Sequence, residues 1–559
     1  MNPTTVFTGM LPVALIVSAL ITAPLSWWLL RRYKAAVIRS MNREAATGTE
    51  LPADLDRRCS IRMGVDEIPG TPPEHLAPSA AQAYQHANSR RNRNIRAYLL
   101  AGLAYACVQS AAWILITKGF TTVRFTWLLV VHLFPIVLPI GLYLLTDRRE
   151  RSILFGSYTA IVLAVAAVVL ARNPSVTTGE LIFYVLFTSA PGTVLLFAFL
   201  RPGIRAVGPL VLSFTLVSVT GALVAVQAAG ASNAVLHALV AFGVKLGLGA
   251  TTLLILLHVV GLLGFGVLGW FLLAWVGSRY RAKRLSSQTL TIDAVVLLFA
   301  VVQSMTFVFN GPAYMLALPL SFAAYKITVN IAFRARSRKC GAAPVLLLLR
   351  VFALGARSEH LFRKISSRWL HSGCITLIAG PDLATSNIEP HEFFAFLGGH
   401  LVRQFVQGAP DLRERVDHLD RQPDPDGRYR VTEFFCHRNN WQVTMRTLAA
   451  QSQTILMDLR GFCPSNQGCL WEIEQLLAWV PLNRIMFAVD GTTDRLLLAQ
   501  SLDRLSRAIP PDSPNASASS TPIRLFRLEA TSDREVESLI QWLYSDLPVA
   551  QSLHASAGT

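Results

Sequence analysis

The chain has 559 residues, of which 52% are hydrophobic and only 15% are charged. So little charge on so long a chain excludes an ordinary soluble globular protein and is typical of a membrane protein. The net charge of +17 comes from residues 1–339, which hold 30 Lys and Arg against 11 Asp and Glu; residues 340–559 hold 21 against 23. Because the basic excess lies between apolar segments, we expect no nucleic-acid partner.

The character of the chain changes about two thirds of the way along it. Long apolar stretches come first, and short apolar runs alternating with amphipathic ones follow. We therefore predict a transmembrane domain at 1–339, with a cytoplasmic loop at 31–96, and a cytosolic α/β domain at 340–559. Polar residues within the second domain predict an inserted loop at 409–430 and a linker at 509–521.

Nine stretches are long and apolar enough to cross a bilayer as helices of ~20 residues. They lie at 8–30, 97–117, 125–146, 153–171, 181–200, 206–229, 250–277, 289–309 and 313–333. Another apolar segment, 235–249, runs directly into the seventh span. We interpret it as a tilted or re-entrant helix; the alternative, a second full span, would reverse the orientation of everything that follows.

Basic residues predict the orientation of these spans in the lipid bilayer. Lys and Arg cluster after the first, third, fifth, seventh and ninth spans, and the alternate loops hold few of them. Because positive loops stay on the cytoplasmic side, we predict an outside N-terminus and a cytoplasmic C-terminal domain. The histidines His132, His237 and His258 are isolated, Asp293 lies at the mouth of the eighth span, and Lys245 is near a helix end. The absence of an acidic or histidine relay makes a transporter with a regulatory domain the least favoured function.

Short apolar runs in the second domain predict a fold of the α/β class. Five predicted strands alternate with helices, at 345–350, 374–379, 453–459, 484–489 and 523–528. This alternation predicts a flavodoxin-like, doubly wound parallel sheet of five strands.

Ligands on sheets of this kind bind beyond the carboxyl ends of the strands. In this chain those ends carry Arg350, the turn Gly380-Pro381-Asp382, Arg460-Gly461 and Asp490-Gly491. Arg350, Gly380 and Asp382 are therefore candidate ligand-binding residues, although the Gly-Pro-Asp turn could equally be a simple turn. The seven cysteines have no metal-ligand spacing, so we expect no metal and no certain cofactor.

Two motifs in the second half of this domain are similar to those of a known family. Asn440-Trp441 opens a predicted helix, and Gly468-Cys469-Leu470-Trp471-Glu472-Ile473 opens another. Together with the first strand, Val345-Leu346-Leu347-Leu348-Leu349-Arg350, they resemble the Toll/interleukin-1 receptor (TIR)-like group over roughly residues 343–545. The second motif looks like the Gly-x-x-Trp-Glu element of bacterial TIR-like domains, which implies a bacterial inner-membrane protein that self-associates through its cytosolic domain.

The resemblance also implies NAD as a substrate, because some TIR domains cleave it. In those domains the glutamate lies three residues after the tryptophan, which is Glu474 here, and Glu472 is the competing candidate. A carboxylate beside the ribosyl centre would stabilise an oxocarbenium-like state. The alternative role for either glutamate is to complement the dipole at the start of a helix. Trp471 is either a ligand platform or part of the core.

The sequence therefore leaves two functions open. One is a multi-pass membrane protein with a cytosolic TIR-like domain for signalling and interaction. The other is a membrane-tethered hydrolase that cleaves NAD, as a defence effector. Both use the same fold, and a fold does not by itself determine a function.

Overall fold

The computed structural model describes residues 3–44, 63–74, 78–145, 147–199, 207–230, 233–308, 316–334, 343–350, 356–380, 390–516, 521–545 and 547. The chain divides into two compact units. The first, which we call the membrane unit after its predicted location, comprises Met1–Tyr33, Asn94–Arg336 and Ile388–Phe394. The second, the α/β unit, comprises Lys34–Arg93, Ser337–Asn387 and Ala395–Thr559. The segment 34–93, which the sequence analysis placed in the first domain, thus belongs by its contacts to the α/β unit.

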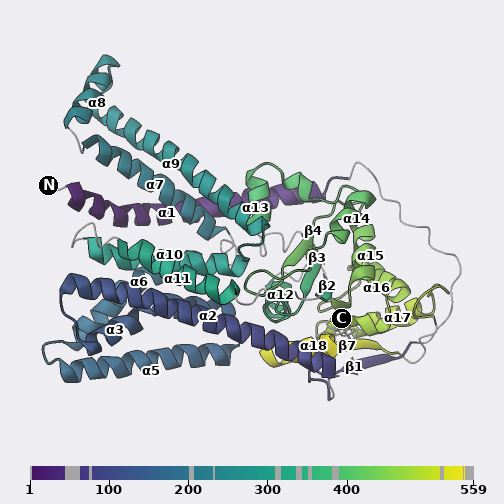
Figure 1. The fold of residues 1–559 in the computed structure, drawn as a ribbon. Coiled ribbons are helices and arrows are strands. Elements are labelled where there is room, and N and C mark those ends of the chain that lie inside the picture. The colour runs from purple at the N-terminus through teal and green to yellow at the C-terminus, as the bar shows by residue number, and fades with distance from the viewer. Residues whose placement is uncertain are drawn as a thin grey trace, which may run out of the picture. The chain divides into compact units, whose positions relative to one another are not determined.

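Helices account for the predicted apolar stretches of the membrane unit (Figure 1). They are α1 (Pro3–Met41), α2 (Pro78–Thr117), α3 (Thr122–His132), α4 (Phe134–Pro139), the π-helix η1 (Ile140–Leu144), α5 (Arg148–Arg172), α6 (Thr178–Phe199), α7 (Gly208–Gly230), α8 (Asn233–Lys245), α9 (Ala250–Arg281), α10 (Ser287–Val308) and α11 (Ala317–Arg334). Within the described part of the chain, five segments are long and apolar enough to cross a membrane: Ala80–Thr117, Thr122–Leu144, Arg148–Arg172, Ala250–Arg281 and Ser287–Ser304. They coincide with the second, third, fourth, seventh and eighth predicted spans.

The long apolar stretch 235–277 is divided between two helices. Gly247, with a φ of 68°, lies in the turn between α8 and α9, and only glycine adopts this left-handed conformation without strain. With 13 residues, α8 is about 20 Å long and too short to cross a hydrocarbon core of ~30 Å. This division agrees with the predicted short helix followed by a single span.

Polar side chains join three helices inside the membrane unit. The Tyr98 hydroxyl of α2 lies 3.0 Å from Oγ1 of Thr289 on α10. Asp293, on the same helix, forms an ion pair with Lys326 of α11 and accepts a hydrogen bond of 3.1 Å from the Tyr325 hydroxyl. Because buried polar groups in an apolar bundle need partners, these bonds stabilise the packing of α2, α10 and α11.

The α/β unit is built around a parallel sheet of seven strands. The strands are β1 (Val65–Ile68), β2 (Val345–Arg350), β3 (Cys374–Ile378), β4 (Val431–Phe434), β5 (Thr454–Asp458), β6 (Ile485–Val489) and β7 (Ile523–Arg527). Their order across the sheet is β1-β7-β6-β5-β2-β3-β4. The inner five are the five predicted strands, and their order, β3-β2-β5-β6-β7, is that of doubly wound, flavodoxin-like sheets.

The prediction of a five-stranded sheet was wrong, because each edge of the sheet carries one more strand. β1 comes from the predicted loop 31–96 and pairs with β7 over the register Val65↔Ile523 to Ile68↔Phe526. β4 directly follows the predicted inserted loop 409–430 and pairs with β3. Both extra strands have only four residues, so their apolar pattern is too short to be distinguished from that of a loop.

The predicted inserted loop 409–430 is also partly helical. α14 (Ala409–Asp417) lies within it, and Leu412 and Val416 of this helix are buried in the core. A helix of nine residues with two buried side chains on one face has little apolar periodicity, which is why its sequence resembles that of a polar loop.

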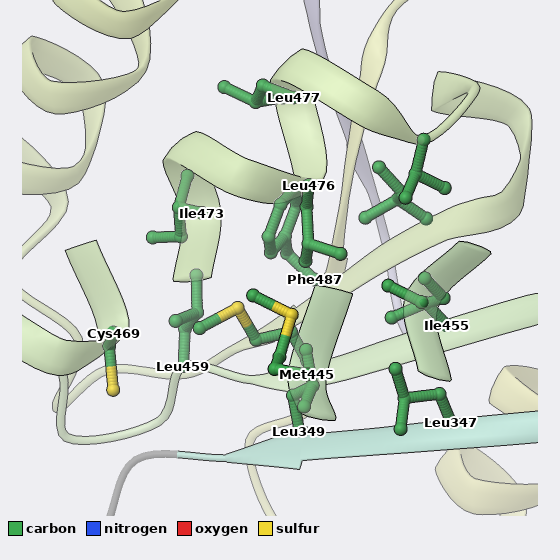
Figure 2. Close-up of a cluster of buried hydrophobic side chains, with 14 of the residues drawn as sticks. Leu347, Leu349, Met445, Ile455, Leu459, Cys469, Ile473, Leu476, Leu477 and Phe487 are labelled. Atoms are coloured by element: carbon green, nitrogen blue, oxygen red, sulfur yellow. The ribbon is translucent and has the colours of Figure 1, made fainter. Parts of the chain in front are cut away.

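Helices cover both faces of the sheet. α12 (Ala356–Trp369) and α18 (Asp533–Ser545) pack on one face, and α15 (Trp441–Gln451), α16 (Gln467–Trp479) and α17 (Arg495–Ser506) pack on the other. Figure 2 shows Ile473 and Leu476 of α16 near Phe487 of β6 and Leu459, the residue that follows β5. Burial on two faces explains the unbroken apolar run of β2. The remaining elements are α13 (Pro390–Leu397), η3 (Leu401–Gln404) and η4 (Leu482–Arg484).

Candidate functional site

The winding of the sheet reverses between β2 and β5. From β2 the chain continues to β3 and β4 on one side, and from β5 it continues to β6 and β7 on the other. The helices that follow these two strands, α12 and α16, consequently lie on opposite faces. This topological switch point is where doubly wound folds bind ligands. Arg350 and Asp458, the last residues of β2 and β5, are register partners there.

Asp458 is held in a buried ion pair with Arg460. The Nε of Arg460 donates to Oδ1 of Asp458 and its Nη2 donates to Oδ2, both at 2.8 Å. The two side chains are 1% and 3% exposed. The Nη1 of Arg460 also donates to Oγ1 of Thr531, at 2.8 Å, beyond the end of β7. Arg460 thus connects the loops that follow β5 and β7.

A second ion pair lies at the end of β6. Arg357 of α12 pairs with Asp490, and the backbone N–H of Thr492 donates to Oδ1 of Asp490 at 2.9 Å. Burial alone would raise the pKa of Asp490, but the hydrogen bonds from Thr492 and the charge of Arg357 hold it below its ordinary value. Asp458 and Asp490 are therefore already paired with arginines of the same unit.

Glu472 is in a different environment from these two carboxylates. Its side chain is 3% exposed, and burial raises its pKa to about 8, although the charge of Arg350 opposes the rise. In the part of the chain that the structure describes, its Oε2 atom has no hydrogen-bond partner. Burial therefore favours the protonated form of Glu472, which lies within electrostatic reach of Arg350 at the switch point.

The two candidate glutamates occupy different sides of α16. Glu474 is half-buried, and residues two positions apart point ~200° apart around a helix. The structure therefore brings Glu472 close to Arg350 and directs Glu474 elsewhere. The residue that the family resemblance singles out, Glu474, is not the one that is buried at the switch point.

Trp471 packs between other side chains of the same unit. Its ring centroid lies 5.1 Å from that of Trp441, at an interplanar angle of 72°. The Arg446 guanidinium carbon lies 5.7 Å from the Trp471 ring centroid, and Arg446 Nε donates to Oε1 of Gln475 at 2.6 Å. This edge-to-face and cation–π packing accounts for the ring without a ligand.

Of the two other candidate ligand-binding residues, only Gly380 lies in the described part of the chain. Gly380 is buried two residues beyond β3, whereas Asp382 lies outside the described residues. Over the residues whose placement is described, no group of three or more His, Cys, Asp or Glu side chains is arranged to hold a metal ion.

The end of α1 is connected to the α/β fold through the loop between β4 and α15. Nδ1 of His437 lies 2.8 Å from the carbonyl oxygen of Ser40, in the last turn of α1. The backbone N–H of Arg438 donates to the carbonyl oxygen of Arg43 at 3.3 Å. His437 is 6% exposed and stacks against Phe405, with ring centroids 5.0 Å apart. These contacts satisfy carbonyl groups at the C-terminus of α1.

Sequence reasoning placed Arg350, Arg460 and Asp490 at the carboxyl edge but missed Asp458 and Arg357, the ion-pair partners of Arg460 and Asp490. Asp458 could have been found, because it ends a buried strand and directly precedes Leu-Arg-Gly. Arg357 and His437 carried no local signal, since their partners are far away in the sequence. Comparison of the chain with protein-family models, with curated proteins and with solved structures gives no match.

Proposed function

We propose that this is a multi-pass protein of the bacterial inner membrane whose cytosolic, TIR-like domain acts as a signalling and interaction module. In this proposal the chain has about nine spans, an outside N-terminus and a cytoplasmic α/β domain that self-associates. The inner strand order of the sheet and the apolar helices support the architecture. The function is supported by the way in which the first helix of the chain enters the α/β unit.

The connection between α1 and His437 is the observation that carries the proposal. α1 is one helix of 39 residues, and its final turn is bonded to the loop before α15 through His437 and Arg438. A displacement of this helix along or around its axis would change those bonds. The apolar part of α1 can therefore influence the cytosolic unit without any diffusing ligand.

Contacts continue from this loop to the candidate site. The backbone N–H of His437 donates to Oδ1 of Asn440 at 2.9 Å. Asn440 precedes α15, whose first residue, Trp441, packs on Trp471 of α16. Glu472 is the next residue after Trp471 on α16. We propose that this series of contacts couples α1 to the switch point; a coupling measurement is needed to test it.

Replacing His437 by alanine is expected to increase hydrogen exchange about tenfold in the last turn of α1 and in α15, because a buried hydrogen bond and a packed ring are lost. If the coupling is correct, the increase extends to the first turns of α16 and leaves β6 and β7 unchanged. The measurement is hydrogen–deuterium exchange with mass spectrometry on the full chain in lipid nanodiscs.

His418 provides a matched control for this experiment. Its Nδ1 also contacts a backbone carbonyl, that of Glu414 at 2.9 Å, but the bond is local and the side chain is exposed. His418→Ala should leave α1, α15 and α16 unchanged. Increased exchange that stops at α15 in the His437 variant would contradict the proposed coupling.

NAD cleavage is the second candidate function, and the position of Glu472 favours it. A buried carboxyl group beside Arg350 at the switch point of a doubly wound sheet is a recognised setting for ligand chemistry. The raised pKa of Glu472 argues against it, because burial favours the neutral acid, whereas an oxocarbenium-like state is stabilised by a carboxylate. The interaction module is therefore the better-supported function.

Incubating the full chain in nanodiscs with NAD is expected to release no nicotinamide above the background of empty discs. A chromatographic assay for nicotinamide at several protein densities, to allow self-association, makes this measurement. Release that is abolished in Glu472→Gln but retained in Glu474→Gln would overturn the prediction and assign catalysis to Glu472. Release abolished only in Glu474→Gln would instead support the residue that the family resemblance selects.

A further inference from the structure

A group of basic side chains surrounds His371, at the amino ends of the strands and thus at the opposite edge of the sheet from the switch point. His371 lies between α12 and β3 and is 6% exposed. Nη1 of Arg90, on α2, donates to the His371 carbonyl oxygen at 3.3 Å. The backbone N–H of Tyr429 donates to the carbonyl oxygen of Leu370 at 2.7 Å, which brings Arg428 next to His371.

The electrostatic field at this place is positive. Burial and the charges of Arg428, Arg91 and Arg90 together lower the pKa of His371 to about 3. Among the neighbouring carboxylates, Asp424 pairs with Arg430, and Asp426 accepts the backbone N–H of Arg428. In addition, the buried Nδ1 atom of His371 has no hydrogen-bond partner within the described residues. A neutral, buried imidazole among three guanidinium groups is the kind of environment that an anion stabilises.

The position of Arg90 and Arg91 along α2 indicates which anion this is. They precede Ala97, the first residue of the predicted second span, by seven and six positions. On a helix this separation is about 10 Å, and the headgroup layer extends roughly 5–8 Å beyond the hydrocarbon core on each side. The side chains of Arg90 and Arg91 are long enough to reach lipid phosphates from there.

We propose that Arg90, Arg91, Arg428 and His371 form a binding site for the phosphate of an anionic lipid headgroup. The guanidinium groups bind the phosphate oxygens in paired hydrogen bonds. Because Arg428 belongs to the C-terminal part of the chain and Arg90 to α2, a bound headgroup would connect the two segments. This inference does not depend on the signalling role proposed above.

The experiment compares the full chain in nanodiscs of phosphatidylcholine with the same chain in discs that also contain phosphatidylglycerol. We expect phosphatidylglycerol to slow hydrogen exchange in peptides around residues 368–374 and 426–430, and to remain bound in native mass spectra after transfer to detergent. Arg428→Gln and Arg90→Gln should each reduce retention about tenfold, as expected for the loss of one hydrogen bond to a charged group. Exchange in β5 serves as the test that both variants are folded.

Arg93→Gln is the matched control, because Arg93 lies on the same helix but is exposed and bonds to the Ser89 carbonyl oxygen at 3.2 Å. Equal losses of lipid in Arg93→Gln and Arg428→Gln would mean that surface arginines attract anionic lipid without a specific site. That outcome would overturn the proposal. Inorganic phosphate added to phosphatidylcholine discs separates the two sources of phosphate. Protection by inorganic phosphate as strong as that by phosphatidylglycerol would show a soluble ligand and overturn the lipid assignment.

Discussion

Replacing Arg460 by methionine is expected to lower the free energy of unfolding of the α/β unit by about 3–5 kcal/mol, because the substitution leaves the carboxylate of Asp458 buried without its partner. The Asp458 side chain is 3% exposed, so solvent cannot replace the lost ion pair. The bond to Thr531 that connects two loops of the carboxyl edge is lost as well. Hydrogen exchange of the β5 amides in the full chain in nanodiscs measures this change.

Two further variants distinguish a buried charge effect from a general loss of packing. Arg507→Met removes an exposed ion pair, in which the Arg507 side chain is 56% exposed and the Asp503 side chain 49% exposed. This substitution should lower the free energy of unfolding by less than about 0.5 kcal/mol. The double variant Asp458→Leu with Arg460→Met should recover most of the stability, since an apolar pair needs no charge compensation. A double variant as unstable as Arg460→Met alone would contradict the buried-charge explanation.

Glu472→Gln is expected to stabilise the α/β unit increasingly as the pH rises. The ordinary pKa of 4.5 applies to the unfolded chain, and the folded pKa is about 8. Between these values the folded protein keeps a proton that the unfolded chain has released. Its free energy of unfolding therefore falls as the pH rises from 4.5 to 8, by as much as about 4–5 kcal/mol, and this term is constant above pH 8.

The glutamine variant does not titrate, so it lacks this decrease. At pH 5 the two proteins should exchange amide hydrogens of α16 at similar rates, and by pH 8 the wild type should exchange much faster. Comparing the two proteins at each pH removes the intrinsic pH dependence of exchange. Glu474→Gln, on the half-buried side of the same helix, should follow the wild type. Parallel pH profiles for Glu472→Gln and the wild type would show that the carboxyl group is not desolvated.

The sheet illustrates what local sequence can and cannot predict. Four of the five inner strands were predictable because each is a largely apolar run buried on two faces, such as Val345–Leu349. The fifth, β7, was predictable from the short apolar pattern of Ile523, Leu525 and Phe526 between arginines. β1 was not predictable, because the first three of its four residues are exposed and only its last, Ile68, is buried. Its partner, β7, lies more than 400 positions further along the chain.

The candidate site also combines residues that local sequence can place with a choice that it cannot make. Arg350, Arg460 and Asp490 could be placed at the carboxyl edge, because the ends of parallel strands meet at one edge of a sheet. The sequence motif could not decide between Glu472 and Glu474. Only the packing of α16 against the sheet determined which of the two is buried.

Local sequence was sufficient to indicate a part made of long apolar helices followed by a doubly wound α/β part, since both conclusions depend on the local periodicity of apolar residues. The tertiary structure alone decided that residues 34–93 belong to the α/β unit, that His437 contacts the end of α1, and that arginines from distant segments meet at His371. Such contacts join segments separated by hundreds of residues. No local pattern encodes them, because their free energy arises only when the chain has folded.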